Sequence, residues 1–500
     1  MIEVFRVSTP LADNSHAEPP PSTPDSGPEL QRTLGSFQVF AISFAFISVA
    51  VGIFGTYGEL LVTAGPVGMW LWLIAVVGQT LVALVVAQFA ARIALSGSSY
   101  QWASRLANPK VGWLFGWLTF WFLAIAVVAL DSALASQAFM PLVGMDENED
   151  TARIITVVIL IIQAVLVIAS TRLLGVITSG AVGVELAIVA ILVVALIAVV
   201  VFTGSGEVSN LTSRGVTEGN TSYFAIGGGL TAGMLMGLTT LVGFDSAANL
   251  AEEAKDPFRS VPRAIVASVL AAGVAGFLFL IALTIAIDDV DAISKSESPV
   301  AAIIRDQLGP VMERILLAAI VFAIFGAGMV VMAACSRQAF AMARDQRFPA
   351  HRLMRKVNPR TQTPIFATLL ILVVGVVLLL VLPGDALIKL ITASTLLPAL
   401  IYGATVVLYL VVRKRLEYKE GGFSLGRFEL PIAVAALIWV VFALFVLVTP
   451  GDSTASNVIV AGLILLGGIY FAKMMIFNRE VLETEPSGGD AVDAVAELTE

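Results

Sequence analysis

The chain has 500 residues, of which 58% are hydrophobic and 13% are charged, and its formal net charge is −8. A water-soluble domain carries roughly 25% charged residues, so this composition excludes an ordinary soluble globular protein. Apolar runs long enough to cross a bilayer, which takes roughly 20 residues, recur from Phe37 to Phe477 without the alternation of a β-barrel. We therefore expect an all-α polytopic membrane protein.

The two ends of the chain and its few cysteine and histidine residues set further limits. Cys335 is the only cysteine, and His16 and His351 lie in polar segments, so we expect no disulfide, no metal site and no cofactor. The sequence has no nucleotide-binding glycine–lysine loop, and we expect no enzyme activity. Residues 1–35 are polar and proline-rich, without the pattern of a signal peptide, and residues 478–500 are acidic. Both should be disordered cytoplasmic tails.

Twelve membrane-spanning helices are predicted in chain order. Two connections are longer than a turn and contain helix-like stretches: 96–112 after the second helix and 288–310 after the seventh. Such pairing is expected if 36–203 and 225–412 are inverted copies of five helices each, with two helices added at 428–477. The predicted helices are 36–61, 67–92, 112–139, 152–171, 174–203, 225–252, 262–287, 313–343, 364–383, 386–412, 428–449 and 456–477.

Lysine and arginine predict the orientation in the membrane. With a cytoplasmic N-terminus, all but six of the 29 basic residues fall on the cytoplasmic side. The positive-inside rule then places both termini on the cytoplasmic side, and we expect the protein in the cell membrane. Because topology explains the basic clusters, we expect no nucleic-acid partner. The six residues on the outer side are Arg153, Arg214, Lys295, Arg305, Arg314 and Lys389.

Glycines interrupt the first and the sixth predicted helices. Gly52 lies near the middle of the first, with Gly55 just beyond it, and Gly243 lies beside Asp245 in the sixth. Glycine costs about 1 kcal/mol in a helix and tolerates unwound geometry. Interruptions at matching positions of two repeats point to a substrate site at the membrane midplane.

Two broken helices would suit a zwitterion. The second half of the first helix, beginning near Gly52, would direct free N–H groups and a partial positive charge inward, where a carboxylate binds. The first halves of both helices would end in carbonyl groups that bind an ammonium. The alternative is that Gly52 and Gly243 are ordinary helix-packing residues, which are common in membrane bundles.

Three ionisable residues are predicted inside helices: Asp131 in the third, Glu185 in the fifth and Asp245 in the sixth. A charge at the bilayer centre costs at least ~2.5 kcal/mol, so each needs a partner, water or a proton. Glu185 and Asp245 are candidate proton carriers. Their alternatives are a neutral structural role for Glu185 and a cap on the second half of the sixth helix for Asp245. Asp131 is a further candidate, expected nearer the outer water.

Several stretches resemble one known family of transporters. These are Ser336-Arg-Gln-Ala-Phe-Ala-Met-Ala-Arg-Asp-Gln-Arg-Phe-Pro with Asn358-Pro-Arg-Thr-Gln-Thr-Pro, and Gly243-Phe-Asp-Ser-Ala with Ala251-Glu-Glu-Ala-Lys-Asp-Pro. They resemble the loop after the eighth helix and the sixth helix of amino acid–polyamine–organocation (APC) superfamily permeases. Ser99-Tyr-Gln-Trp-Ala-Ser-Arg-Leu and residues 428–450 are most similar to the amino acid/choline transporter branch, which includes permeases for GABA and choline. The resemblance covers about residues 35–477. It implies a LeuT-type fold of five plus five helices with alternating access.

Carried over residue by residue, the resemblance implies a substrate site formed by the two broken helices, with Phe244 or a neighbour as an aromatic lid. Val51 stands where the family usually has a serine, so a hydroxyl that would help bind a carboxylate is missing. A carboxylate could still bind backbone N–H groups, but the change favours a substrate bound mainly by its amine. The implied substrate-binding residues are Ser48, Ala50, Val51, Gly52, Thr239, Thr240, Gly243, Phe244 and Asp245.

The coupling ion is predicted from two absences in the sequence. The fifth helix lacks the lysine that some proton-coupled relatives carry, and the eighth lacks an adjacent serine/threonine pair for a sodium site. Proton coupling or exchange is therefore favoured, with Glu185, Asp245 and Asp131 as candidates. We expect a secondary transporter that imports an amino acid or an amine such as GABA, choline or a polyamine. A channel-like facilitator and a receptor without solute flux are the alternatives.

Overall fold

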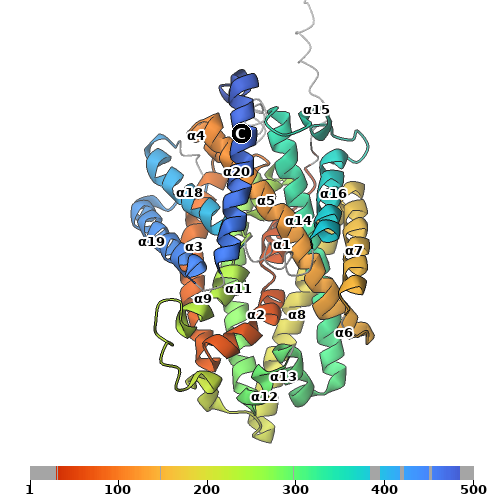
Figure 1. Cartoon of the computed structure of the whole chain (residues 1–500), viewed down its shortest axis with the longest axis vertical. Helices are drawn as coiled ribbons and strands as arrows, with labels where there is room; N and C mark the ends of the chain where they lie inside the picture. The colour runs from red at the N-terminus through yellow and green to blue at the C-terminus, as the bar shows by residue number, and fades with distance from the viewer. Residues whose placement is uncertain are drawn as a thin grey trace, which may run out of the picture.

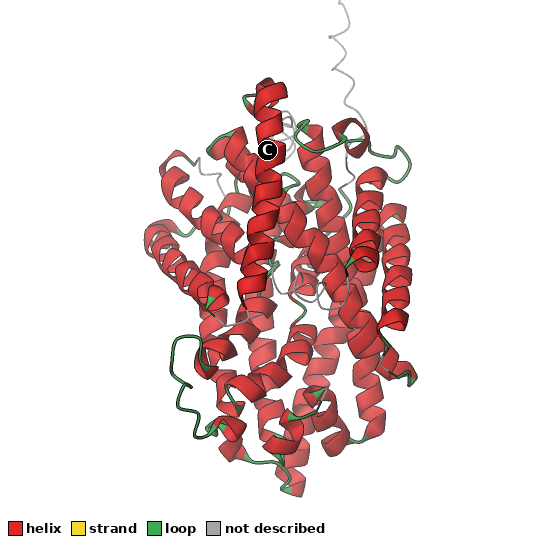
Figure 2. Ribbon diagram, in the orientation of Figure 1, coloured by secondary structure: helices red, strands yellow, loops and turns green. Residues whose placement is uncertain are grey.

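The computed structural model describes residues 30, 32–146, 148–296, 298–382, 395–416, 422–449 and 453–484. Over these residues the chain forms an elongated bundle of helices (Figures 1 and 2). Ten of the described helical segments are long and apolar enough to cross a membrane, which confirms a polytopic α-helical membrane protein. Two of the twelve predicted spans are not among these ten. The span predicted at 364–383 is the 17-residue helix α16, and the span at 225–252 is broken into short helices.

The helices follow in this order. The first part of the chain contains α1 (Ser36–Ile47), α2 (Val49–Thr63), α3 (Leu71–Ala90), α4 (Ser98–Leu106), α5 (Pro109–Ala133), a π-helical turn (Leu134–Phe139), α6 (Met140–Val143), α7 (Glu149–Ala169) and α8 (Thr171–Thr203). The middle part contains α9 (Gly229–Thr240), α10 (Ser246–Asn249), α11 (Pro257–Ile285), α12 (Val290–Ser294), α13 (Pro299–Leu308) and α14 (Pro310–Arg344). The last part contains α15 (His351–Met354), α16 (Ile365–Val381), α18 (Leu396–Val412), α19 (Glu429–Val448) and α20 (Ser453–Phe477).

Side-chain caps set several helix starts. Asn108 accepts hydrogen bonds from the N–H groups of Lys110 and Val111, and Pro109 fills the first helical position, so α5 begins three residues before the predicted 112. Ser170 caps α8 in the same way and separates it from α7. The predicted helix 386–412 is described from Leu396 onward as α18, because residues 383–394 lie outside the described residues.

Helix α14 runs through the interior of the bundle, where it contacts α1, α5, α7, α8 and α16. It carries Cys335, whose buried Sγ lies 3.6 Å from the carbonyl oxygen of Phe120. Helices α8 and α20 instead turn large apolar side chains outward, and Phe202 and Ile469 are 87% and 71% exposed. Such outward apolar faces are unfavourable in water and fit the hydrocarbon of a bilayer.

The bundle has two distinct ends. Helices α4 and α15 lie at one end, together with the end of α20, and α12 and α13 lie at the other (Figure 1). We refer to them as the α4 end and the α13 end. Leu34, just before α1, is buried and pairs with Ala254, which ties the start of α1 to the segment after α10. Leu34, at the end of the predicted tail 1–35, is therefore packed against the bundle.

Candidate functional site

The first predicted helix is interrupted at Ser48, which separates α1 from α2. Ser48 has a left-handed backbone (φ 41°). Its N–H donates the last hydrogen bond of α1 to the carbonyl of Phe44, and its own carbonyl accepts the first hydrogen bond of α2, from the N–H of Gly52. The break expected near Gly52 therefore lies four residues earlier. Gly52 is helical, and its glycine serves close packing, because a Cβ there would lie 2.1 Å from Cγ2 of Thr240.

A carboxylate of the chain itself caps the start of α2. Glu185, buried in α8, accepts the Ala50 N–H at 2.9 Å and the Ser48 hydroxyl at 3.3 Å. Helix N-termini attract anions because their first N–H groups lack partners and carry a partial positive charge. Glu185 thus takes part of the anion-binding position that the sequence suggested for a substrate carboxylate. Val51 follows in the same turn and is half-buried.

The sixth predicted helix is broken between α9 and α10. Residues 241–245 are not helical, and Gly243 has φ +76°. A Cβ on Gly243 would lie 1.8 Å from the ring of Phe46, so glycine is needed both for the conformation and for the approach of α1. The Ser246 hydroxyl at the start of α10 donates to the carbonyl of Ile42 in α1 at 3.2 Å. The two breaks therefore lie against each other.

Asp245 is held by two hydroxyl groups from distant parts of the chain. The Tyr402 hydroxyl of α18 donates to its Oδ1 at 2.8 Å, and the Ser98 hydroxyl of α4 donates to its Oδ2 at 3.3 Å. The Tyr402 oxygen also accepts the Gly243 N–H at 2.8 Å, and its ring stacks on Phe244 with centroids 4.7 Å apart. Asp245 precedes α10, but its side chain makes no capping hydrogen bond, so the capping interpretation was wrong.

A small cavity lies at this second break. Its volume is about 10 Å³, which is room for about one water molecule. Asp245 is the only acidic or basic side chain among the described residues that line it. This volume is too small for an amino acid or an amine. The lining residues are Phe46, Thr119, Phe122, Leu123, Gly243, Asp245, Ser246, Asn249, Pro398, Ile401 and Tyr402.

The remaining predicted residues lie outside this cavity. Thr239 bonds its hydroxyl to the Leu235 carbonyl in its own helix, and Thr240 faces Gly52. Asp131 is fully buried, where its Oδ1 accepts a hydrogen bond from Gln163 of α7 at 2.8 Å. Helices α7 and α14 cover it, so it has no access to water in this conformation. Among the described residues, no three His, Cys, Asp or Glu side chains lie close enough to bind a metal ion.

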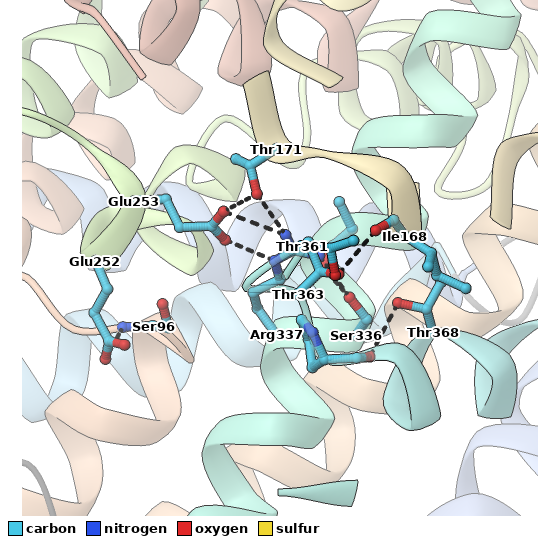
Figure 3. Close-up of polar contacts among 12 residues, drawn as sticks. Ser96, Ile168, Thr171, Glu252, Glu253, Ser336, Arg337, Thr361, Thr363 and Thr368 are labelled. Atoms are coloured by element: carbon cyan, nitrogen blue, oxygen red, sulfur yellow. Dashed lines mark hydrogen bonds and ion pairs between the residues drawn. The ribbon is translucent and has the colours of Figure 1, made fainter. Parts of the chain in front are cut away.

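A polar network joins the segment after α10 to α8 and α14 (Figure 3). Arg337 of α14 and Glu253, which follows α10, form an ion pair at 2.7 Å, and both side chains are fully buried. The Thr171 hydroxyl at the start of α8 bonds to the same carboxylate. Beside them, Glu252 pairs with Arg344 at 3.1 Å and accepts the Ser96 N–H. The segment that follows the broken helix is thereby fixed to α8 and α14.

The end of the described chain is fixed to the same region by Arg347. This buried side chain donates to the carbonyl oxygens of Val481 at 3.1 Å and Thr484 at 2.6 Å. It also donates to the Tyr100 hydroxyl of α4, which donates in turn to Asp345 at 2.6 Å. Burial and the Asp345 carboxylate raise the pKa of Tyr100 well above its usual value, so the phenol stays protonated.

Comparison with known proteins identifies the family. A family model described as amino acid permease matches residues 34–470. The chain belongs to this family of the APC superfamily. The permease is 27% identical to the amino-acid permease BAT1 of Arabidopsis thaliana, over 83% of this chain and 84% of the relative. It is 26% identical to a putative polyamine transporter of Candida albicans (89% and 84%) and to the GABA-specific permease of Saccharomyces cerevisiae (93% and 87%).

Of the residues that line the cavity in the permease, only Gly243 and Asp245 were predicted from the sequence, and both hydroxyl partners of Asp245, Tyr402 and Ser98, were missed. Tyr402 lies in an apolar helix, where a buried phenol needs a hydrogen-bond partner, and that requirement could have singled it out. Ser98 begins α4 with a left-handed backbone (φ 42°). Its role depends on the return of the chain to Asp245, for which its local sequence gives no signal.

Proposed function

We propose that the permease is a secondary active transporter that imports an amino acid or a related amine across the cytoplasmic membrane by alternating access, with protons as the coupling ion. The observation that carries this proposal is the contact between two interrupted helices, α1–α2 and α9–α10, with Asp245 beside the cavity where they meet. Broken helices present peptide dipoles and unpaired backbone groups to a small charged solute. The solutes named for the relatives, which are amino acids, polyamines and GABA, are amino acids or related amines.

The proposal includes twelve spans and an inverted repeat of five helices. Counting the α9–α10 pair and α16 as spans gives the twelve. Helix α4 follows the second span at one end of the bundle, and α13 follows the seventh at the other end, as an inverted repeat requires (Figure 1). Helix α1 contacts α10 and α2 contacts α9, so the halves of the two broken helices lie in opposite order.

The α4 end is assigned to the cytoplasm, with both termini. It carries the basic segment from Arg337 to Arg360, and the positive-inside rule favours this side for such a segment. The buried pair of Arg337 and Glu253 then closes the cytoplasmic exit, and inward opening requires this network to separate. A channel is the alternative description, and the saturation of uptake with concentration separates the two.

Glu185 is the proposed coupling carboxyl. In its charged form it accepts the Ala50 N–H and neutralises the positive end of α2. Protonation weakens this contact and frees the first turn of α2 to rearrange. Proton binding and movement of the broken helix are thereby linked through one hydrogen bond.

Reconstitution in proteoliposomes tests the function. Uptake of a radiolabelled amino acid or amine should saturate with concentration, exchange with internal substrate, and increase when an inward proton gradient is imposed. A competition panel of amino acids, polyamines and choline then identifies the solute. Ion conductance without saturation would support a channel, and no flux of any compound would contradict transport.

A further inference from the structure

Tyr402 contacts three consecutive residues of the break between α9 and α10, which are Gly243, Phe244 and Asp245. Its hydroxyl accepts the Gly243 N–H and donates to Asp245, both at 2.8 Å, and its ring lies against Phe244. The side chain is 4% exposed and lines the cavity. One residue of α18 therefore holds the broken segment of the sixth helix in its closed form.

The surroundings of Asp245 define the ligand that could replace Tyr402. Both carboxylate oxygens accept hydrogen bonds from neutral hydroxyl groups, those of Tyr402 and Ser98. No lysine or arginine is among the described residues that line the cavity. A buried carboxylate whose donors are both neutral hydroxyl groups has no counter-charge, so a cation that also donates hydrogen bonds stabilises it further.

On the basis of the proposed transport function, we propose that the Tyr402 hydroxyl occupies the position at Asp245 that the substrate's ammonium group takes. The cavity of about 10 Å³ cannot hold an ammonium and its carbon chain beside this hydroxyl. Substrate entry therefore moves Tyr402 away, which breaks its bonds to Asp245 and Gly243 and releases the segment between α9 and α10. After the substrate leaves, the hydroxyl returns and closes the site.

This exchange selects for amines that carry N–H groups. A primary or secondary ammonium can donate to Asp245 in place of the phenol, whereas a quaternary ammonium cannot. A quaternary ammonium in this position would displace the phenol and leave the buried carboxylate oxygen without a donor, which costs the desolvation of that group. Primary amines are therefore substrates of this site, and choline is not.

The test compares Tyr402→Phe with Tyr409→Phe. Tyr409 is buried in the same helix two turns away, where it contacts Phe89 and does not line the cavity, so its variant is a matched control. Binding of 4-aminobutyrate, L-alanine, 1,4-diaminobutane and choline is measured by thermal stabilisation of the solubilised protein, since a ligand that binds only the folded form raises its stability. Uptake by proteoliposomes gives KM and kcat for the same compounds.

Tyr402→Phe should bind the wild-type amine substrate about tenfold more tightly or better, because no hydroxyl has to leave the charged carboxylate. Its kcat should fall, because the site no longer closes normally after release, while Tyr409→Phe behaves as wild type. Unchanged or weaker binding by Tyr402→Phe, or choline binding as tight as that of the primary amines, would overturn the proposal. If no compound binds or enters with the wild-type protein, the transport function itself has failed.

Asp245→Asn gives a second arm should Tyr402→Phe fail to fold. An asparagine keeps an oxygen that accepts from Tyr402 but removes the charge. Affinity for the amine should fall more than tenfold in this variant. Wild-type affinity in Asp245→Asn would show that the ammonium binds elsewhere and would refute the exchange.

Discussion

Arg337 and Glu253 face each other across the α4 end with Nε and Oε1 2.7 Å apart, and neither side chain has any exposed surface. Burying such a pair costs free energy, because both ions lose their hydration. Removing only one partner is strongly destabilising, because it leaves the other charge buried without a counter-charge. It holds the segment after α10 against α14, so the same contact that fixes the fold also fixes the end of the broken helix.

Glu253→Gln should therefore destabilise the protein strongly. It leaves the Arg337 guanidinium buried without its counter-charge, and the expected loss is about 3–5 kcal/mol in the free energy of unfolding. Thermal unfolding in detergent measures the change. Glu149→Gln is the control, because Glu149 is 64% exposed in its pair with Arg153, and a loss of about 1 kcal/mol or less is expected. Equal effects in both variants would contradict a special role for the buried pair.

Gly243→Ala should abolish substrate binding. The added methyl group meets Phe46 at 1.8 Å, and the backbone at φ +76° is strained for any residue with a side chain. Uptake and ligand-induced thermal stabilisation report the loss, and size-exclusion chromatography checks that the variant is folded. Gly462→Ala in α20, where nothing lies within 4 Å of the new Cβ, should behave as wild type. Normal uptake by Gly243→Ala would show that this break has no part in transport.

Gly52→Ala should reduce uptake through packing, not by the loss of a ligand contact. Its Cβ would lie 2.1 Å from Cγ2 and 2.6 Å from Oγ1 of Thr240, which pushes α2 away from α9. The double variant Gly52→Ala/Thr240→Gly removes both of these atoms and also the Thr240 Cβ, which would lie 2.8 Å away, and it should recover a large part of the uptake rate. If the double variant is as impaired as Gly52→Ala alone, Gly52 acts by a route other than this contact.

Glu185→Gln should flatten the pH dependence of uptake. Glutamine is neutral like the protonated carboxyl and keeps an oxygen that can accept from the Ala50 N–H and the Ser48 hydroxyl, but it has no exchangeable proton, so the cap on α2 no longer changes with pH. The measurement is the initial uptake rate across a pH series, with and without an imposed proton gradient. Asp131→Asn, which keeps an acceptor for Gln163 away from the cavity, is the comparison. A wild-type pH profile in Glu185→Gln would assign Glu185 a structural role.

The membrane helices could be predicted because hydrocarbon imposes long apolar segments. The predicted 152–171 and 174–203 agree with α7 and α8 to within three residues at each end. The break in the first helix could not be located from the sequence. The glycine at position 52 allows the close approach of Thr240, whereas the break itself lies at Ser48, beside the hydrogen bond from the Ala50 N–H to Glu185. Both contacts are made between segments more than 100 residues apart.

The second break was better predicted, because Gly243 itself adopts the left-handed conformation that its residue type suggests. The partners of Asp245 were not predicted. Ser98 and Tyr402 precede and follow it by about 150 residues, and only the packed bundle brings them to one carboxylate. A polar residue in an apolar helix indicates that a partner exists without naming it.

The burial of Cys335 makes the native protein suitable for site-directed labelling. Its thiol is enclosed within α14, so water-soluble maleimides should leave the unmodified chain unlabelled. A single cysteine introduced at Asn249, on the wall of the cavity, would then be the reactive position. Its labelling rate, compared with and without substrate, would follow the opening of the site towards the aqueous phase in real time.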